Sequence, residues 1–253
     1  DEALIFLEQA MISDPVRLEL SNLYRAESVK AKRHEKSIDF FKRQVAKSDA
    51  PNEMFYNLAF AYIDKIPTVG PMGAGFLSKR AIAQFQLVLD RNPNDWVATY
   101  GIGMNYLHWP DYFKKKDRAS KYLQKSLALQ KQGKIKSYYI LTYIRLGDGY
   151  VKTGEIDKGY EVWNEWLQYY PKHKDLLNRV KMKKSKIVQD MVYLYNPNNS
   201  IGEINTYISV LWAKDIPEEL VPLEKNSPKQ AGIGGLIKGS KAKVGEDKIG
   251  LFS

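Results

Sequence analysis

Cysteine is missing from the sequence of 253 residues. Its absence excludes disulfides, thiolate metal sites, iron–sulfur clusters held by cysteine and cysteine nucleophiles. Histidine is scarce, because only His34, His108 and His173 occur, and they lie far apart in the chain. Neither a metal nor a cofactor is therefore expected. Long apolar runs are missing as well, and without about 20 consecutive apolar residues no segment is expected to span a membrane.

Signatures of common catalytic sites are also missing, since the sequence holds no GxSxG, HExxH or P-loop pattern. The glycine cluster AGIGG at 231–235 follows no expected strand, so it does not qualify as a phosphate-binding loop. Glu161 and Glu165 lie one helical turn apart without a histidine nearby, which favours a solvent-facing helix surface. The sequence thus predicts that the protein is not an enzyme.

The sequence begins at Asp1 without an initiator methionine or a signal-like segment. A targeting peptide removed during export would explain this start, and so would a missing upstream segment. The lack of cysteine permits export to the periplasm or another extracytoplasmic compartment without requiring it. Export is the expectation, and the cytoplasm stays open as the alternative.

Residues 140–173 read ILTYIRLGDGYVKTGEIDKGYEVWNEWLQYYPKH and form a pattern of 34 residues. With Ile140 as position 1, Tyr143, Leu146 and Gly147 fall at positions 4, 7 and 8, and Pro171 falls at position 32. This segment resembles the tetratricopeptide repeat, a helix–turn–helix unit with small residues where its helices cross and a proline at its end.

The same register recurs upstream in two further units. In one unit Phe55 and Tyr62 match the first helix and Pro93 matches the end, with ten extra residues between the helices. In the next, Gly103 and Tyr106 match the first helix, with four extra residues between the helices. A degenerate repeat precedes them, and before it a second helix stands without its first. Those two parts are marked by Ala3, Leu7, Ala10, Pro15, Tyr24 and Phe41.

The resemblance implies an all-α fold, an α-solenoid of tetratricopeptide helix–turn–helix repeats with a C-terminal helical cap and an extended tail. We expect a half-repeat and four repeats over 1–173, a helical cap over 174–214 and an extended basic arm rich in Gly, Pro and Lys over 215–253. Within the cap, 174–195 is expected as one basic amphipathic helix, followed by a shorter helix over 200–213. The Pro/Gly-rich stretch 64–75 is expected as a long loop between two helices.

In tetratricopeptide proteins the first helices of the repeats line a concave groove. The resemblance therefore implies a mostly apolar groove for an extended segment or helix of a partner, and the alternative is that the chain's own C-terminal tail covers some of it. The expected groove residues are Tyr56, Phe60, Ile63, Tyr100, Met104, Leu107, Leu141, Ile144 and Asp148. Asn57 and Arg145 match in part the polar clamp with which chaperone-type members grip a carboxylate, but apolar residues replace the rest of that clamp.

Lysine and arginine outnumber aspartate and glutamate by 39 to 29, which gives a net charge of +10. This excess suits an anionic partner. The tyrosines fall mostly at core positions of the repeats, so an acidic protein surface is favoured over nucleic acid, which would need exposed aromatics along the basic patches. The patch most clearly marked lies in the second insertion and comprises Lys114, Lys115, Lys116 and Arg118. Beside it, Trp109, Tyr112 and Phe113 are too many aromatics for a short loop to bury, which favours an interface.

The arm over 215–253 contains regularly spaced apolar residues between glycines and lysines. We expect these residues to anchor the arm on another subunit, so that the arm tethers neighbouring protomers of an assembly. The expected anchors are Ile233, Leu236, Ile237, Leu251 and Phe252.

These features together predict a non-catalytic scaffold that assembles or tethers subunits of a larger multiprotein complex. The alternative is an exported chaperone-like or ligand-capturing module.

Overall fold

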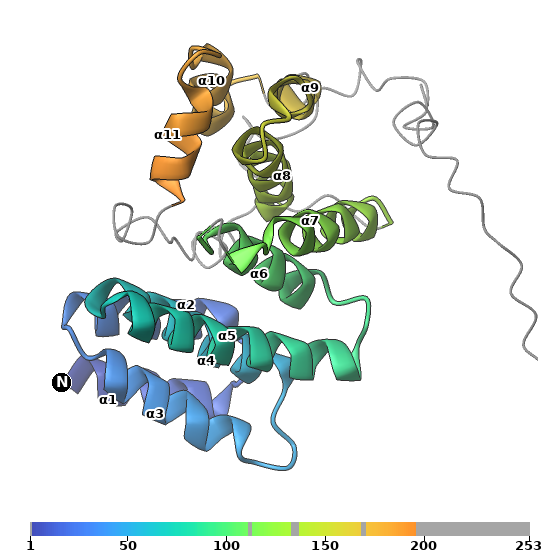
Figure 1. Ribbon diagram of the computed structural model, residues 1–253. Helices are drawn as coiled ribbons and strands as arrows, with labels where there is room; N and C mark the ends of the chain where they lie inside the picture. The colour runs from blue at the N-terminus through green and yellow to red at the C-terminus, as the bar shows by residue number, and fades with distance from the viewer. Residues whose placement is uncertain (1, 111–112, 133–136, 168–170, 196–253) are drawn as a thin grey trace, which may run out of the picture. The chain divides into compact units, whose positions relative to one another are not determined.

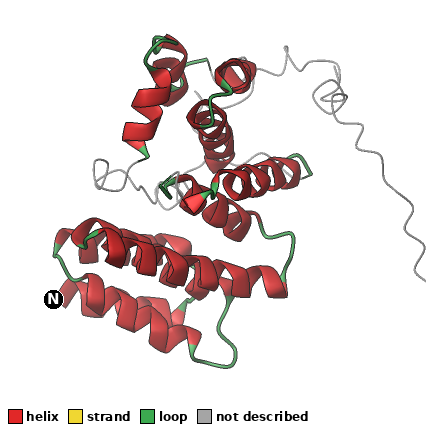
Figure 2. Cartoon of the chain, in the orientation of Figure 1, coloured by secondary structure: helices red, strands yellow, loops and turns green. Residues whose placement is uncertain are grey.

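The computed structural model describes residues 2–110, 113–132, 137–167 and 171–195, and within these ranges the chain is helical without a strand (Figures 1 and 2). The helices are α1 (Glu2–Ser13), α2 (Leu18–Lys30), α3 (His34–Val45), α4 (Asn52–Lys65), α5 (Pro71–Arg91), α6 (Trp96–Leu107), α7 (Lys116–Gln130), α8 (Ile140–Lys152), α9 (Ile156–Leu167), α10 (Lys174–Lys181) and α11 (Ile187–Leu194). Two short 3-10 helices, Ile66–Thr68 and Ser137–Tyr139, precede α5 and α8.

From α1 to α10 each helix packs on the next one in the sequence, and α11 packs back on α8. The most extensive contacts join α4 with α5, α6 with α7 and α8 with α9, which are the helix pairs of the three well-matched repeats. Successive pairs are joined by α3 with α4, α5 with α6 and α7 with α8. Contacts of this kind, between helices that are close in sequence, are typical of stacked helical repeats.

Glycine at the helix crossings lets paired helices approach closely. A Cβ atom at Gly147 in α8 would lie 2.2 Å from Nε1 of Trp163 in α9, a distance that no real carbon–nitrogen contact allows. Trp163 is fully buried and directs Nε1 toward the carbonyl oxygen of Ile144, 3.4 Å away. Gly147 is therefore the small residue at which α8 and α9 cross, as the tetratricopeptide resemblance implies.

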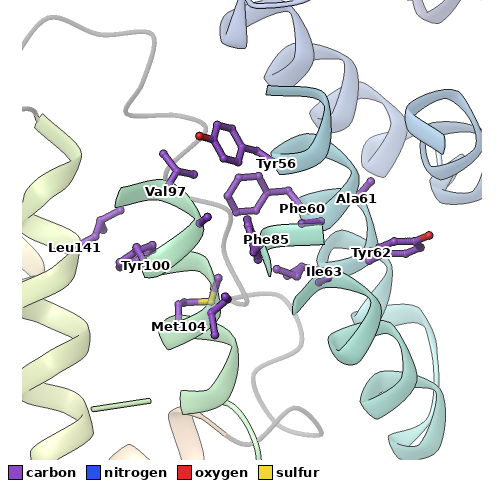
Figure 3. Packing of buried hydrophobic residues seen from close by; sticks show 14 of the residues in the cluster. Tyr56, Phe60, Ala61, Tyr62, Ile63, Phe85, Val97, Tyr100, Met104 and Leu141 are labelled. Atoms are coloured by element: carbon purple, nitrogen blue, oxygen red, sulfur yellow. The ribbon is translucent and has the colours of Figure 1, made fainter. Parts of the chain in front are cut away.

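Aromatic side chains fill the layers between the helices. The rings of Phe60 in α4 and Phe85 in α5 meet edge to face with centroids 5.3 Å apart, as Figure 3 illustrates. The ring of Trp96 stacks on that of Tyr100 one turn later in α6, with centroids 4.9 Å apart. Burial of each such side chain contributes about 1.5–3 kcal/mol to folding, and the aromatic repeat positions therefore carry much of the core.

The stretch 64–75 is not a long loop, so that expectation is wrong. Residues Ile66–Thr68 form a 3-10 turn directly after α4, and α5 begins at Pro71 and runs for 21 residues. Proline is favoured at the first position of a helix because its missing N–H would have no partner there. The extra residues lengthen α5 at its start instead of forming a separate loop.

The expected single helix over 174–195 is in fact two helices, α10 and α11. Met182 takes an extended conformation, with φ −63° and ψ 145°, and its carbonyl oxygen accepts a hydrogen bond from the hydroxyl of Tyr160 at 2.5 Å. Because the chain turns over 182–186, α10 packs on α9 while α11 packs on α8. The buried side chains Leu176, Ile187 and Met191 then all reach the core.

Two predictions lie outside the described residues. They are the short helix over 200–213 and the arm over 215–253 with its anchors Ile233, Leu236, Ile237, Leu251 and Phe252.

Candidate functional site

The predicted groove residues lie on the first helices of three repeats. The α4 residues are Tyr56, Phe60 and Ile63, the α6 residues are Tyr100, Met104 and Leu107, and the α8 residues are Leu141, Ile144 and Asp148. All nine are buried, and none exposes more than 5% of its surface. Truncation of Phe60 or Tyr100 would therefore remove core packing and lower stability. In this structure the side chains are covered, and their use by a partner stays a prediction.

The α4 part of this inner face is tied to α2 by a buried ion pair. Arg25 donates from Nε to Oδ2 of Asp64 at 2.8 Å and from Nη2 to Oδ1 at 3.3 Å. Its guanidinium lies 4.9 Å from the ring centroid of Phe60. Asn57, the partial match to a carboxylate clamp, accepts from Arg25 at 3.4 Å and donates to the carbonyl of Glu53 at 2.8 Å. Its amide is thus engaged within the repeat.

The α6 part is fixed to α4 through the start of α6. The hydroxyl of Tyr56 donates a hydrogen bond to Asp95, and burial together with this carboxylate raises the pKa of Tyr56 well above its ordinary range. Asp95 in turn caps α6, since its Oδ1 accepts from the backbone N–H of Ala98 at 2.8 Å. Side-chain caps of this kind stabilise a helix by about 1 kcal/mol. Through Asp95, the hydroxyl of Tyr56 therefore ties α4 to the start of α6.

The α8 part is occupied by the chain's own C-terminal helices. Arg179 in α10 donates to both oxygens of Asp148, from Nε at 2.5 Å and from Nη2 at 2.7 Å. The hydroxyl of Tyr195, directly after α11, donates to Asp148 and accepts from Nη1 of Arg145 at 2.7 Å. This end of the inner face is thus covered by helices of the chain itself, whereas the C-terminal tail of the alternative lies outside the described residues.

The polar cluster around Asp148, with Arg145, Lys152, Arg179 and Tyr195, carries more positive than negative charge. Arg145, Arg179 and Lys152 are all buried, and Asp148 is the carboxylate that the described part of the cluster provides. Lys152 donates to the carbonyl oxygens of Leu107 at 2.7 Å and Trp109 at 3.2 Å. Two of the three cations depend on Asp148, by direct pairing or through the hydroxyl of Tyr195.

A search with protein-family models finds no match to the chain. Among solved structures, a thermophilic TPR protein from Thermus thermophilus superposes with a TM-score of 0.56 and 18% sequence identity, over 74% of this chain and 89% of that one. The chain has a tetratricopeptide-repeat fold. The predicted all-α solenoid of helix–turn–helix repeats is thereby confirmed.

One curated relative shares sequence with part of this tetratricopeptide-repeat chain. The BBSome complex member BBS4 from Bos taurus is 28% identical over 99 residues, which are 39% of this chain. The match spans 17% of the length of that relative.

Arg179 and Tyr195 contact the α8 part of the inner face, and the sequence did not reveal these contacts. Arg179 belongs to the segment that the sequence predicts as one basic amphipathic helix over 174–195, and the structure leaves only 8% of its surface exposed. The signal was Asp148 itself, because a carboxylate at an inward position of a tetratricopeptide repeat needs a buried cation. Since that partner lies 31 residues further along the chain, the repeat pattern does not identify it.

The predicted basic patch is only partly exposed to solvent. Lys114 and Arg118 are exposed, whereas Lys115 and Lys116 are half-buried. Trp109 donates from Nε1 to Oγ of Ser78 at 2.7 Å and is half-buried. Phe113 does remain 46% exposed. Tyr112, the third aromatic of this loop, lies outside the described residues.

The described ranges contain no group of three or more His, Asp or Glu side chains that could hold a metal ion. They also contain no helix that is long and apolar enough to cross a membrane.

Stability should fall as the pH is lowered from 7 to 5, because His108 is buried in its neutral form. Burial, and after it the charge of Arg145, lowers the pKa of His108 from 6.5 to about 3. Between these values the unfolded chain binds the proton and the folded chain does not, so stability is lost at about 1.4 kcal/mol per pH unit below 6.5. Urea unfolding at pH 7, 6 and 5 measures this slope. His108→Gln should flatten it, and an equal slope in the variant would contradict this assignment.

Proposed function

We propose that the chain is a non-catalytic interaction module that assembles subunits of a larger multiprotein complex. The tetratricopeptide-repeat fold presents helices to protein partners, and this is the general role that the fold supports. In our proposal the inner face of α4, α6 and α8 receives a partner helix, and the arm over 215–253 tethers a neighbouring subunit.

The observation that supports the proposal most directly is that the chain's own C-terminal helices cover the inner face at α8. A helical segment of the chain lies on α8 and is recognised there through an arginine on Asp148 and a tyrosine hydroxyl between Asp148 and Arg145. Surfaces that bind a helix in this way, by an apolar face with a few buried polar contacts, are a general mode of peptide recognition. The same chemistry suits a partner helix that offers Arg and Tyr.

Two further features support a role in a complex. The relative with partial sequence similarity is named as a BBSome complex member. The net charge of +10 favours partners with acidic surfaces. Self-association through the arm and residence outside the cytoplasm are parts of the same proposal.

Purification of the tagged chain from its source cells, followed by mass spectrometry and analytical ultracentrifugation, tests the assembly role. The full chain should co-purify with a fixed set of protein subunits and sediment as a larger species. Deletion of 224–253 should abolish this assembly and leave the melting temperature unchanged, because the described helices lie upstream of the deletion.

A matched pair of variants separates the anchors from the arm as a whole. Serine in place of Ile233, Leu236 and Phe252 should abolish assembly, whereas alanine in place of Ser227, Gln230 and Ser240 should preserve it. A full chain that purifies alone would refute the assembly role. Normal assembly of the truncated chain would refute the tether.

A further inference from the structure

A pocket of about 200 Å³ lies between α3, the end of α4 and the start of α5. Its buried apolar walls are Ile38 of α3, Tyr62 of α4 and Leu77 of α5. Figure 3 shows Tyr62 pointing away from Tyr56 and Phe60 on the same helix, so this pocket is separate from the inner face described above. It is smaller than the roughly 300–1,000 Å³ typical of small-molecule sites, which suits a single inserted side chain.

Exposed apolar side chains border this pocket. Phe76 lines it and is 55% exposed, and Met72, one helical turn earlier on α5, is 91% exposed. Exposed large apolar side chains beside an open apolar pocket are typical of an interaction surface, because a partner removes them from water. The N-terminal extension of α5, which a standard repeat lacks, supplies both residues.

The rim of the pocket is mainly cationic. Lys42, Lys65 and Arg80 line it together with one carboxylate, that of Glu35. Lys65 is paired with Glu35, and Lys42 donates to Asp39 at 3.1 Å on the exposed surface of α3. Arg80 has no carboxylate partner within the described ranges, so its charge is available to a ligand.

Two aromatic rings hold the guanidinium of Arg80 in place. Its central carbon lies 4.2 Å from the ring centroid of Phe76 and 5.8 Å from that of Tyr62. A guanidinium stacked on a ring keeps its N–H groups free at its edge, where they match the two oxygens of a carboxylate. Stacking also reduces the conformational freedom that binding would otherwise remove.

We propose that the pocket between α3 and α5 binds a short acidic segment of a partner protein. One large apolar side chain of the segment enters between Ile38 and Leu77 and covers Phe76, and a flanking carboxylate pairs with Arg80. A second copy of this chain is disfavoured as the occupant, because its net charge of +10 opposes approach to a cationic rim. The proposal does not rest on the function proposed above, since the pocket and the inner face are different surfaces.

A phage-displayed library of random peptides, panned on the full chain and counter-selected on an Arg80→Glu variant, tests this assignment. Enriched peptides should carry Asp or Glu next to an aromatic or branched apolar residue. For the most enriched peptide, made synthetically, Arg80→Glu should weaken binding about tenfold or more and Phe76→Ala by a similar factor, as for central interface residues. Fluorescence anisotropy measures both.

Two exposed residues of the same helix provide matched controls. Lys79→Glu makes the same charge change beside Arg80, and Leu87→Ala removes another exposed apolar side chain. Both should leave the peptide affinity within about twofold, since neither lines the pocket. Circular dichroism confirms that all four variants fold.

Several results would overturn the proposal. They are an absence of enriched peptides, enrichment of peptides without acidic residues, and equal weakening by Lys79→Glu and Arg80→Glu. Binding of a single-stranded oligonucleotide that depends on Arg80, in place of acidic peptides, would also overturn it. Because assembly in source cells is measured separately, failure here leaves the role in complex assembly intact.

Discussion

Replacement of Asp148 by alanine should destabilise the chain by about 3–5 kcal/mol, the cost typical of breaking a buried ion pair. The substitution leaves Arg179 without its carboxylate and removes the acceptor of the Tyr195 hydroxyl. Arg145 and Arg179 would then stay buried without a carboxylate partner among the described residues. Urea unfolding at pH 7 measures the loss as a lower midpoint.

The control removes an ion pair of similar length at the surface. Lys184 and Asp157 lie 2.6 Å apart with exposed side chains, so Asp157→Ala should leave the unfolding midpoint nearly unchanged. The charge-balanced double variant Asp148→Leu with Arg179→Leu should recover most of the lost stability. Equal midpoints for Asp148→Ala and Asp157→Ala would show that the buried cluster does not hold α10 and α11 on α8.

Replacement of Gly147 by leucine should cost about 3 kcal/mol, at the upper end of what overpacking costs. Even the first side-chain carbon would overlap Nε1 of Trp163, whose ring is closed in on all sides. Either α8 and α9 must separate or the indole must leave its rotamer. For a chain of this size the melting temperature should fall by roughly 6–12 °C.

Gly149 provides the matched control in the same helix. A Cβ atom there would lie 3.6 Å from Cδ1 of Leu107, which is ordinary van der Waals contact. Gly149→Ala should therefore leave the melting temperature unchanged or raise it slightly, because alanine is favoured over glycine in a helix by about 1 kcal/mol. A Gly147→Leu protein that melts like the wild type would mean that the register of this repeat is wrong.

The repeat register could be predicted because it depends on local spacing. Gly147 and Trp163 lie 16 residues apart in one unit. Gly103 and Leu123 occupy the same two positions of the preceding unit, 20 residues apart because that unit has four extra residues between its helices. Both glycines are tight helix crossings in the structure. A pattern that repeats in one chain constrains each copy, so the helix pairs follow from the sequence alone.

The site could be predicted only in part, because its decisive contacts are not local. The positions of the inner face on α4, α6 and α8 followed from the register, but their occupation by Arg179 and Tyr195 depends on a turn over 182–186. Apolar spacing through 174–195 is continuous enough to suggest one helix, and the polar run KMKKSK does not say in which direction the chain turns. The pocket at α5 was missed for a similar reason, since 64–75 has the composition of a loop.

The closure of α11 on α8 also sets the apparent strength of any ligand that uses that end of the inner face. Tyr195 contacts Asp148 across 47 residues of sequence, whereas each helix pair is held by near neighbours. A ligand that uses Asp148 therefore requires open molecules, in which Tyr195 and α11 have left α8 while the repeats stay folded. A ligand that needs Asp148 binds the open molecules, and its observed dissociation constant is the intrinsic constant divided by their fraction. Weakening the Tyr195 contact would then tighten such binding without any change in the surface that the ligand touches.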